Sequence, residues 1–173
     1  VSLGVSNMNT IRTVGSFSSW FKLSTTASSA DVIRIFTDSN NNIRVFYHAA
    51  SNELRCVYSA GGTANIATLT DAIENDGLWH HVTGTWISSG NVKIYLDGTL
   101  KDTTSISGTY SGSVSAASIG NNADGGGFWI GSIDEVSIFN YELTAANVTT
   151  LYNSGIPQPV SSDSGLFGWW RMG

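Results

Sequence analysis

The sequence has few charged side chains, two prolines, three histidines and one cysteine among its 173 residues. Because Cys56 has no second cysteine to pair with, an intrachain disulfide is excluded. Lys and Arg number only eight, are scattered, and leave a formal net charge of −5, so nucleic-acid binding through a basic patch is excluded. No apolar run approaches the roughly 18 residues of a membrane-spanning helix, and we expect no membrane insertion.

We expect Ser, Thr, Asn and Gly to occupy the surface positions that charged residues take in most proteins. Charged residues make up 12% of the chain and hydrophobic residues 41%, against an ordinary charged share of about 25%. This composition is typical of secreted or particle-bound β proteins. The first residue is Val1, with neither an initiating Met nor a signal peptide, so we expect a processed or excised piece of a longer protein.

Hydrophobic alternation with a period of two predicts β-strands along most of the chain. In SFSSWFKL, Phe17, Phe21 and Leu23 share one face and Trp20 lies on the other. Short polar turns at residues 39–42 and 50–53 separate three successive alternating runs, which predicts an antiparallel meander. Many short strands at close spacing indicate an all-β fold, a two-sheet antiparallel sandwich or jelly roll.

One short helix is predicted late in the chain. Thr144 is a plausible N-cap, and Gly155 is suited to follow the last turn. Between them, helical spacing is shown by Ala145, Val148, Leu151 and Tyr152. We expect this helix to pack as a lid over one end of the sandwich.

The C-terminal residues predict a linker followed by a strand. Both prolines lie in residues 156–165, which show no periodicity, whereas 166–173 are again apolar. We therefore divide the chain into a domain at 1–155, a linker at 156–165 and a terminal strand at 166–173. That strand either completes this sandwich or begins a following module, and pairing with a neighbouring copy would build a homo-oligomer or a tandem array.

Two adjacent histidines stand in DGLWHHVTGTW, residues 76–86, where they suggest a metal site or acid–base catalysis. Successive side chains of a strand point to opposite faces. Val82 and Trp86 share the parity of His80, so we expect His80 to be a buried, hydrogen-bonded core residue and His81 to be exposed. The two rings then cannot converge on one metal ion or substrate.

No catalytic residues or metal ligands are assigned from the sequence. Glu53, Glu74 and Glu142 lie in turns or before the helix, and Asp134 and Glu135 are adjacent, which places them on opposite faces of a strand. Neither G-x-S-x-G nor H-E-x-x-H occurs. We therefore expect a protein that is not an enzyme, and a polysaccharide-acting enzyme remains the least favoured alternative.

The Gly-rich loop NNADGGG and the aromatic residue after it form the predicted ligand site. Asn121, Asn122 and Asp124 can bind sugar hydroxyls, and Trp129 can stack on the C–H face of a sugar ring. The same loop oxygens would suit calcium, but a single carboxylate is too few for a tight site. We therefore expect no cofactor.

The stretch DGLWHHVTGTWISSGNVKIYLDGTLKDT resembles the central hairpin of LamG-like jelly-roll domains, in the concanavalin A-like lectin/glucanase superfamily. The residues that match its G-x-WHHV and Y-x-DG motifs are Trp79, His80, His81, Val82, Tyr95, Asp97 and Gly98. The run from SIGNNADGGG through IDEVSIFN to the predicted helix is similar to the closing part of the same family. The resemblance covers residues 16–155.

The resemblance implies two antiparallel sheets packed face to face, and modules that mostly bind glycans or proteins, often with calcium at a loop rim. No family carboxylate cluster is present to hold calcium. The family's apolar opening strand is missing from residues 1–12, and a segment like it closes the chain as LFGWWRMG.

Together these observations predict a non-catalytic extracellular or virion-surface binding module. We expect a lectin-like, carbohydrate-binding role in adhesion, with a glycan or a protein as the ligand. The alternative is a structural or assembly subunit of a virion appendage or surface fibre that has no affinity for sugars.

Overall fold

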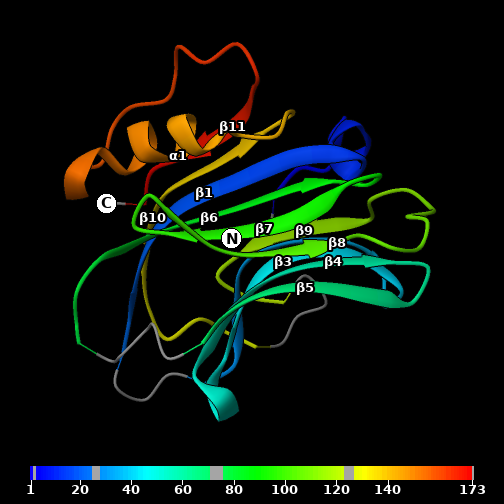
Figure 1. The fold of residues 1–173 in the computed structure, drawn as a ribbon, viewed down its shortest axis with the longest axis horizontal. Coiled ribbons are helices and arrows are strands. Elements are labelled where there is room, and N and C mark those ends of the chain that lie inside the picture. The colour runs from blue at the N-terminus through cyan, green and yellow to red at the C-terminus, as the bar shows by residue number, and fades with distance from the viewer. Residues whose placement is uncertain (2, 25–27, 71–75, 123–126, 173) are drawn as a thin grey trace.

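The computed structural model describes residues 1, 3–24, 28–70, 76–122 and 127–172. Two antiparallel sheets face each other, and the predicted all-β sandwich with one short C-terminal helix is confirmed (Figure 1). Among the described residues, no helix is long and apolar enough to cross a membrane.

The six-stranded sheet contains, in spatial order, β11 (Leu166–Trp170), β10 (Gly131–Phe139), β1 (Val14–Leu23), β6 (His80–Ile87), β7 (Asn91–Leu96) and β8 (Thr99–Ser105). The five-stranded sheet contains β5 (Thr63–Thr70), β4 (Glu53–Ala60), β3 (Asn41–His48), β2 (Ala30–Asp38) and β9 (Ala116–Ile119). Single-turn helices occur at Met8–Arg12, Ala49–Ser51 and Asn153–Gly155. The predicted meander is confirmed, because β2, β3 and β4 pair antiparallel in chain order.

The main core lies between the two sheets. Phe17, Phe21 and Leu23 enter it from β1 as their alternation predicted. On β6, a side chain at Gly84 would collide with Cys56, so the close approach of the sheets there requires glycine. Cys56 is fully buried, and burial raises the pKa of its thiol to about 12, so the thiol stays protonated and unreactive at neutral pH.

A second cluster of apolar side chains covers the outer face of the six-stranded sheet, which is the face turned away from the five-stranded sheet. Its buried members are Tyr95, Phe139, Leu143, Val148 and Val160. The helix α1 (Ala145–Tyr152) and the segment after it lie across this face (Figure 1). The helix therefore covers a sheet face, and the expectation that it lies over one end of the sandwich is wrong.

Both ends of α1 are set by local chemistry. Thr144 caps the first turn as predicted, and it forms a reciprocal capping box with Asn147. The helix ends at Asn153, which adopts a left-handed φ of 44° and takes the place that the sequence assigned to Gly155.

Within residues 166–173, Leu166–Trp170 form β11, which pairs antiparallel with β10 of the same chain. Phe167 and Trp170 pack against the main core, while Leu166 and Trp169 pack against the second cluster. The strand therefore joins the two apolar clusters at one edge of the sheet.

Candidate functional site

His81 is buried, with 2% of its surface exposed, and the expectation that it is exposed is wrong. The parity argument was correct, since His81 points to the outer face of the sheet. That face is covered, because the ring lies 5.2 Å from Trp20 and 6.1 Å from Tyr152, the last residue of α1. His81 Nε2 is 2.7 Å from Ser18 Oγ. Burial lowers the pKa of His81 to about 4, so the ring is neutral at neutral pH.

His80 points to the other face, at the rim of the core beside Phe21. It is only partly buried, so the expectation that it is a buried core residue is wrong. Its Nδ1 lies 2.9 Å from Asp97 Oδ2 and its Nε2 lies 3.1 Å from Asp76 Oδ2. Burial lowers the pKa of His80, but the hydrogen bonds to Asp97 and Asp76 outweigh that effect and raise it overall. The two histidines have separate partners and do not converge on one site, as predicted.

The pair of carboxylates around His80 should make the stability of the fold depend on pH. The pKa of His80 is higher in the folded protein than in the unfolded chain. The stabilisation by Asp97 and Asp76 is therefore complete below the unfolded pKa of about 6.5 and is lost as the pH rises through the folded pKa. We expect His80→Gln to lower the melting temperature more at mildly acidic pH than at alkaline pH. His48→Gln, on an exposed contact with Ser51, is the control. A melting-temperature difference that does not change with pH would contradict this account.

A β-bulge at Glu135 changes the expected directions of two carboxylates. Glu135 has a left-handed φ of 51°, and the register of β1 against β10 shifts at this point. Asp134 lines a hollow together with Trp20, and Glu135 bonds to Trp169 of the second cluster. Both carboxylates therefore lie on the outer face, and the prediction that they lie on opposite faces is wrong.

Both carboxylate oxygens of Glu135 accept hydrogen bonds from other residues of the protein. Its Oε2 accepts a hydrogen bond of 2.6 Å from Trp169 Nε1, and its Oε1 accepts one of 2.9 Å from Arg171 Nε. Both partners come from β11 or the residue after it, so Glu135 fastens the terminal strand. Glu74, another acidic residue considered from the sequence, lies outside the described residues.

The segment after the Gly-rich loop presents Phe128 to solvent, with 65% of its surface exposed. Trp129 faces inward instead. Its ring is edge-on to Phe21 at 5.8 Å and to Tyr47 at 6.4 Å, and it is packed against the main core. Alternation correctly placed Phe128 and Trp129 on opposite faces but did not show which of the two faces the core. Phe128 is therefore the exposed aromatic that the sequence analysis missed.

Trp129 lines a shallow hollow of about 290 Å³ with Val1, Ile119 and Met172. Three polar atoms of the surrounding rim are buried without a hydrogen-bond partner among the described residues: Asn121 Oδ1, Asn122 Oδ1 and Trp129 Nε1. An unpaired buried polar group is costly, and it is uncommon away from functional sites. Asp124 lies outside the described residues, so its predicted place beside these groups stays a prediction.

The described residues of the rim do not make a calcium site. They supply amide oxygens, and the hollow beside Trp129 has no carboxylate in its lining. Within the described part of the chain, no group of three or more His, Cys, Asp or Glu residues could hold a metal ion.

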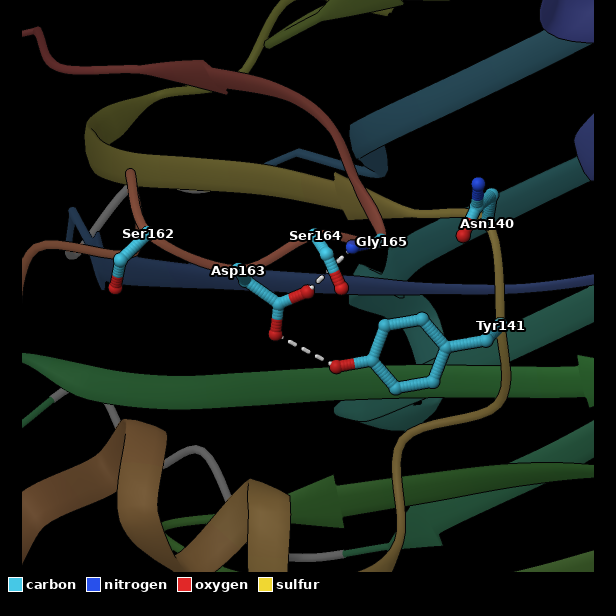
Figure 2. Close-up of a pocket in the computed structure, with 6 residues that line it drawn as sticks. All are labelled: Asn140, Tyr141, Ser162, Asp163, Ser164 and Gly165. Atoms are coloured by element: carbon cyan, nitrogen blue, oxygen red, sulfur yellow. Dashed lines mark hydrogen bonds between the residues drawn. The ribbon is translucent and has the colours of Figure 1, made fainter.

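A hollow of about 560 Å³ lies where the C-terminal segment meets the turn after β10, and its lining is polar (Figure 2). Tyr141 donates a hydrogen bond of 2.7 Å to Asp163 Oδ2, and the backbone N–H of Gly165 donates one of 2.8 Å to Asp163 Oδ1. Burial and the neighbouring Asp163 raise the pKa of Tyr141 to about 12. Since both oxygens of Asp163 are used to fix the turn that leads into β11, this hollow has a structural role.

The two antiparallel sheets of six and five strands define a lectin-like β-sandwich domain. The model of the concanavalin A-like lectin/glucanases superfamily matches residues 2–149, and the chain belongs to this family. The resemblance found in the sequence is thereby confirmed.

The relatives that match this chain in sequence are much longer than the chain itself. The sushi, von Willebrand factor type A, EGF and pentraxin domain-containing protein 1 of Rattus norvegicus is 36% identical over 90 residues, covering 46% of this chain and 2% of that protein. Its counterpart in Mus musculus is 35% identical over 91 residues, with the same coverage. The chain therefore spans only a small fraction of these relatives' length.

Solved structures share the fold at low sequence identity. Domain 4 of AbnA, an extracellular arabinanase from Geobacillus stearothermophilus in complex with arabinotriose, has a TM-score of 0.64 at 21% identity and covers 81% of this chain and 66% of that chain. The type C botulinum neurotoxin, described as depending on two ganglioside molecules for cell entry, has a TM-score of 0.65 at 19% identity, covering 89% and 39%. A heptameric SAP-like pentraxin from Limulus polyphemus has a TM-score of 0.62 at 17% identity, covering 81% and 70%. These similarities establish the fold.

Proposed function

We propose that this chain is a non-catalytic, extracellular glycan-binding module that binds sugars at the loop rim that includes Asn121, Asn122 and Phe128. The observations that support this most directly are the exposed ring of Phe128 and the two buried amide oxygens of Asn121 and Asn122, which have no hydrogen-bond partner among the described residues. The arabinotriose and ganglioside ligands named for proteins of the same fold are consistent with it.

The chemistry of the rim suits a sugar. An exposed aromatic ring offers a flat apolar surface for the C–H face of a pyranose, and amide groups bond its hydroxyls with directional preference. Trp129 supports the rim from within through its contacts with Phe21 and Tyr47. We retain Asp124 as a proposed further ligand of the sugar. None of the similar proteins named above is a virion protein, so we retain the extracellular setting and not the virion surface.

Removing either aromatic residue should weaken binding. We expect Phe128→Ala and Trp129→Ala each to raise the Kd for a bound glycan by about 5- to 30-fold, which corresponds to about 1–2 kcal/mol. Only Trp129→Ala should also lower the melting temperature, because its ring is packed against the core. Calorimetric titration with a glycan panel measures the Kd, and thermal unfolding measures the melting temperature.

The matched control is Leu100→Ala, which removes an exposed apolar side chain from β8 on the far edge of the sheet. This variant should bind like the wild type. If Phe128→Ala and the control bind equally well, the rim is not the site. If the wild type binds no glycan of the panel, the proposal fails and the alternative of a structural or assembly subunit replaces it.

A further inference from the structure

The exposed large apolar side chains of the described residues fall mainly into two groups. Val1 and Met172 line the hollow beside Trp129, and Phe128 and Ile130 flank Trp129 in the sequence. The second group is Leu78, Trp79 and Ile156. Trp79 lines a separate hollow of about 280 Å³ with Trp20, Asp134, Gly155 and Pro157, which we call the outer hollow.

Trp79 is held in place although its ring is open to solvent. It is 45% exposed, which is unusual for so large an apolar side chain. On one side, the backbone N–H of Leu78 donates a hydrogen bond of 2.8 Å to Asp76 Oδ1. On the other side, His80 is bonded to Asp76 and Asp97. The backbone on both sides of Trp79 is therefore fixed, which reduces the entropy that a ligand must overcome on binding.

The floor of the outer hollow is rigid. Trp20 is 5% exposed, and its ring is stacked on Tyr152 at 5.9 Å with an interplanar angle of 24°. Tyr152 and His81 cover much of Trp20, so Trp79 supplies the one open aromatic surface among the described lining residues.

Asp134 is oriented with one oxygen left for a ligand. Its Oδ1 accepts hydrogen bonds from the backbone N–H groups of Glu135 at 2.7 Å and Met172 at 2.8 Å. Its Oδ2 has no hydrogen-bond partner among the described residues, and no Lys, Arg or His of that part of the chain lies within ion-pair distance. The bulge at Glu135 is what turns this carboxylate to the outer face.

We propose that the outer hollow is a second glycan site, separate from the loop rim, and that it takes one residue of a neutral sugar. The apolar face of the sugar lies on the indole of Trp79, and its hydroxyls donate hydrogen bonds to Asp134 Oδ2. Because this carboxylate has no paired cation, a uronic or sialic acid placed there meets an uncompensated like charge, which excludes acidic sugars.

A sugar fits these groups better than an organic cation does. A quaternary ammonium group gains most when several ring faces surround it. Here only Trp79 presents an open ring, since Trp20 is covered by its neighbours. One flat ring beside one directional acceptor matches a saccharide that has an apolar face and hydroxyls along its edge.

The test follows the indole N–H signals of the tryptophans by nuclear magnetic resonance, with Trp79→Phe used to assign the Trp79 signal. The probes are matched pairs of neutral and acidic sugars: galactose with galacturonate, glucose with glucuronate, and lactose with sialyllactose. We expect at least one neutral sugar to shift the Trp79 signal at millimolar concentration and its acidic partner to shift it less. Asp134→Asn should weaken that response several-fold.

Phe128→Ala is the matched control, because it alters the rim and leaves the outer hollow unchanged. If sugars shift the Trp129 signal but never that of Trp79, the rim proposal survives and the second site is overturned. A shift of the Trp79 signal by choline but by no sugar overturns it in favour of a cation site. If acidic and neutral partners shift the Trp79 signal equally, the assigned role of Asp134 is wrong.

Discussion

Deleting residues 164–173 is expected to lower the free energy of unfolding by about 4 kcal/mol or more. The deletion removes β11, whose large side chains pack against both apolar clusters: Leu166, Phe167, Trp169 and Trp170. Full burial of one such side chain stabilises a fold by about 1.5–3 kcal/mol. These four are partly buried, so they contribute together about the amount given above. Urea unfolding followed by tryptophan fluorescence and circular dichroism measures the change.

The deletion also opens the edge of β10, and an open strand edge invites pairing with another chain. We therefore expect the truncated protein to associate, and a peptide of residues 164–173 to restore the monomer by adding in place of β11. Removing only the residues after Arg171 is the control and should cost little. If the truncated chain stays monomeric and equally stable, β11 is not part of this sandwich and belongs to a following module.

Acid should destabilise the fold through His81. Its folded pKa of about 4 lies below the unfolded value of about 6.5, so the unfolded chain takes up a proton that the folded chain does not. The loss of stability that His81 causes is therefore absent above the unfolded pKa and grows as the pH falls toward about 4. Below the folded pKa, this loss in the free energy of unfolding amounts to about 3 kcal/mol.

His81→Phe isolates this effect, because a phenyl ring keeps the aromatic contacts with Trp20 and Tyr152 and cannot take up a proton. We expect a smaller loss of stability on acidification in the variant than in the wild type. At neutral pH a constant offset should remain from the lost contact with Ser18. Curves of unfolding free energy against pH that run parallel for the two proteins would contradict the assigned burial of a neutral His81.

Features that depend on neighbouring residues were predicted well from the sequence. Alternation located β1, β2, β3, β4 and β6, and the side chain of Thr144 marked the start of α1. The apolar run at the C-terminus was expected to be a strand because tryptophans beyond a polar linker need a surface on which to pack. The same alternation also predicted which side chains of β1 face the main core.

The errors have two physical causes, which are the position of a distant segment and a local irregularity of the backbone. His81 is buried because α1, some 70 residues later in the chain, covers its side of the sheet, and strand parity says nothing about such a cover. The bulge at Glu135 changed the direction of Asp134, and a left-handed glutamate has no local sequence signal. The outer hollow combines residues from β1, β10 and the segments before β6 and after α1, so it could not be foreseen from any one motif.

The central claim is that this sandwich binds sugars through two exposed aromatic residues without cleaving them. It is tested most directly by calorimetric titration of one neutral oligosaccharide into the wild type and into the double variant Trp79→Ala, Phe128→Ala, with the sugar recovered afterwards and checked for cleavage. The account predicts saturable binding by the wild type, loss of that binding in the double variant at nearly unchanged melting temperature, and recovery of the sugar intact. Equal binding by both proteins, or release of shorter sugars by the wild type, would contradict it.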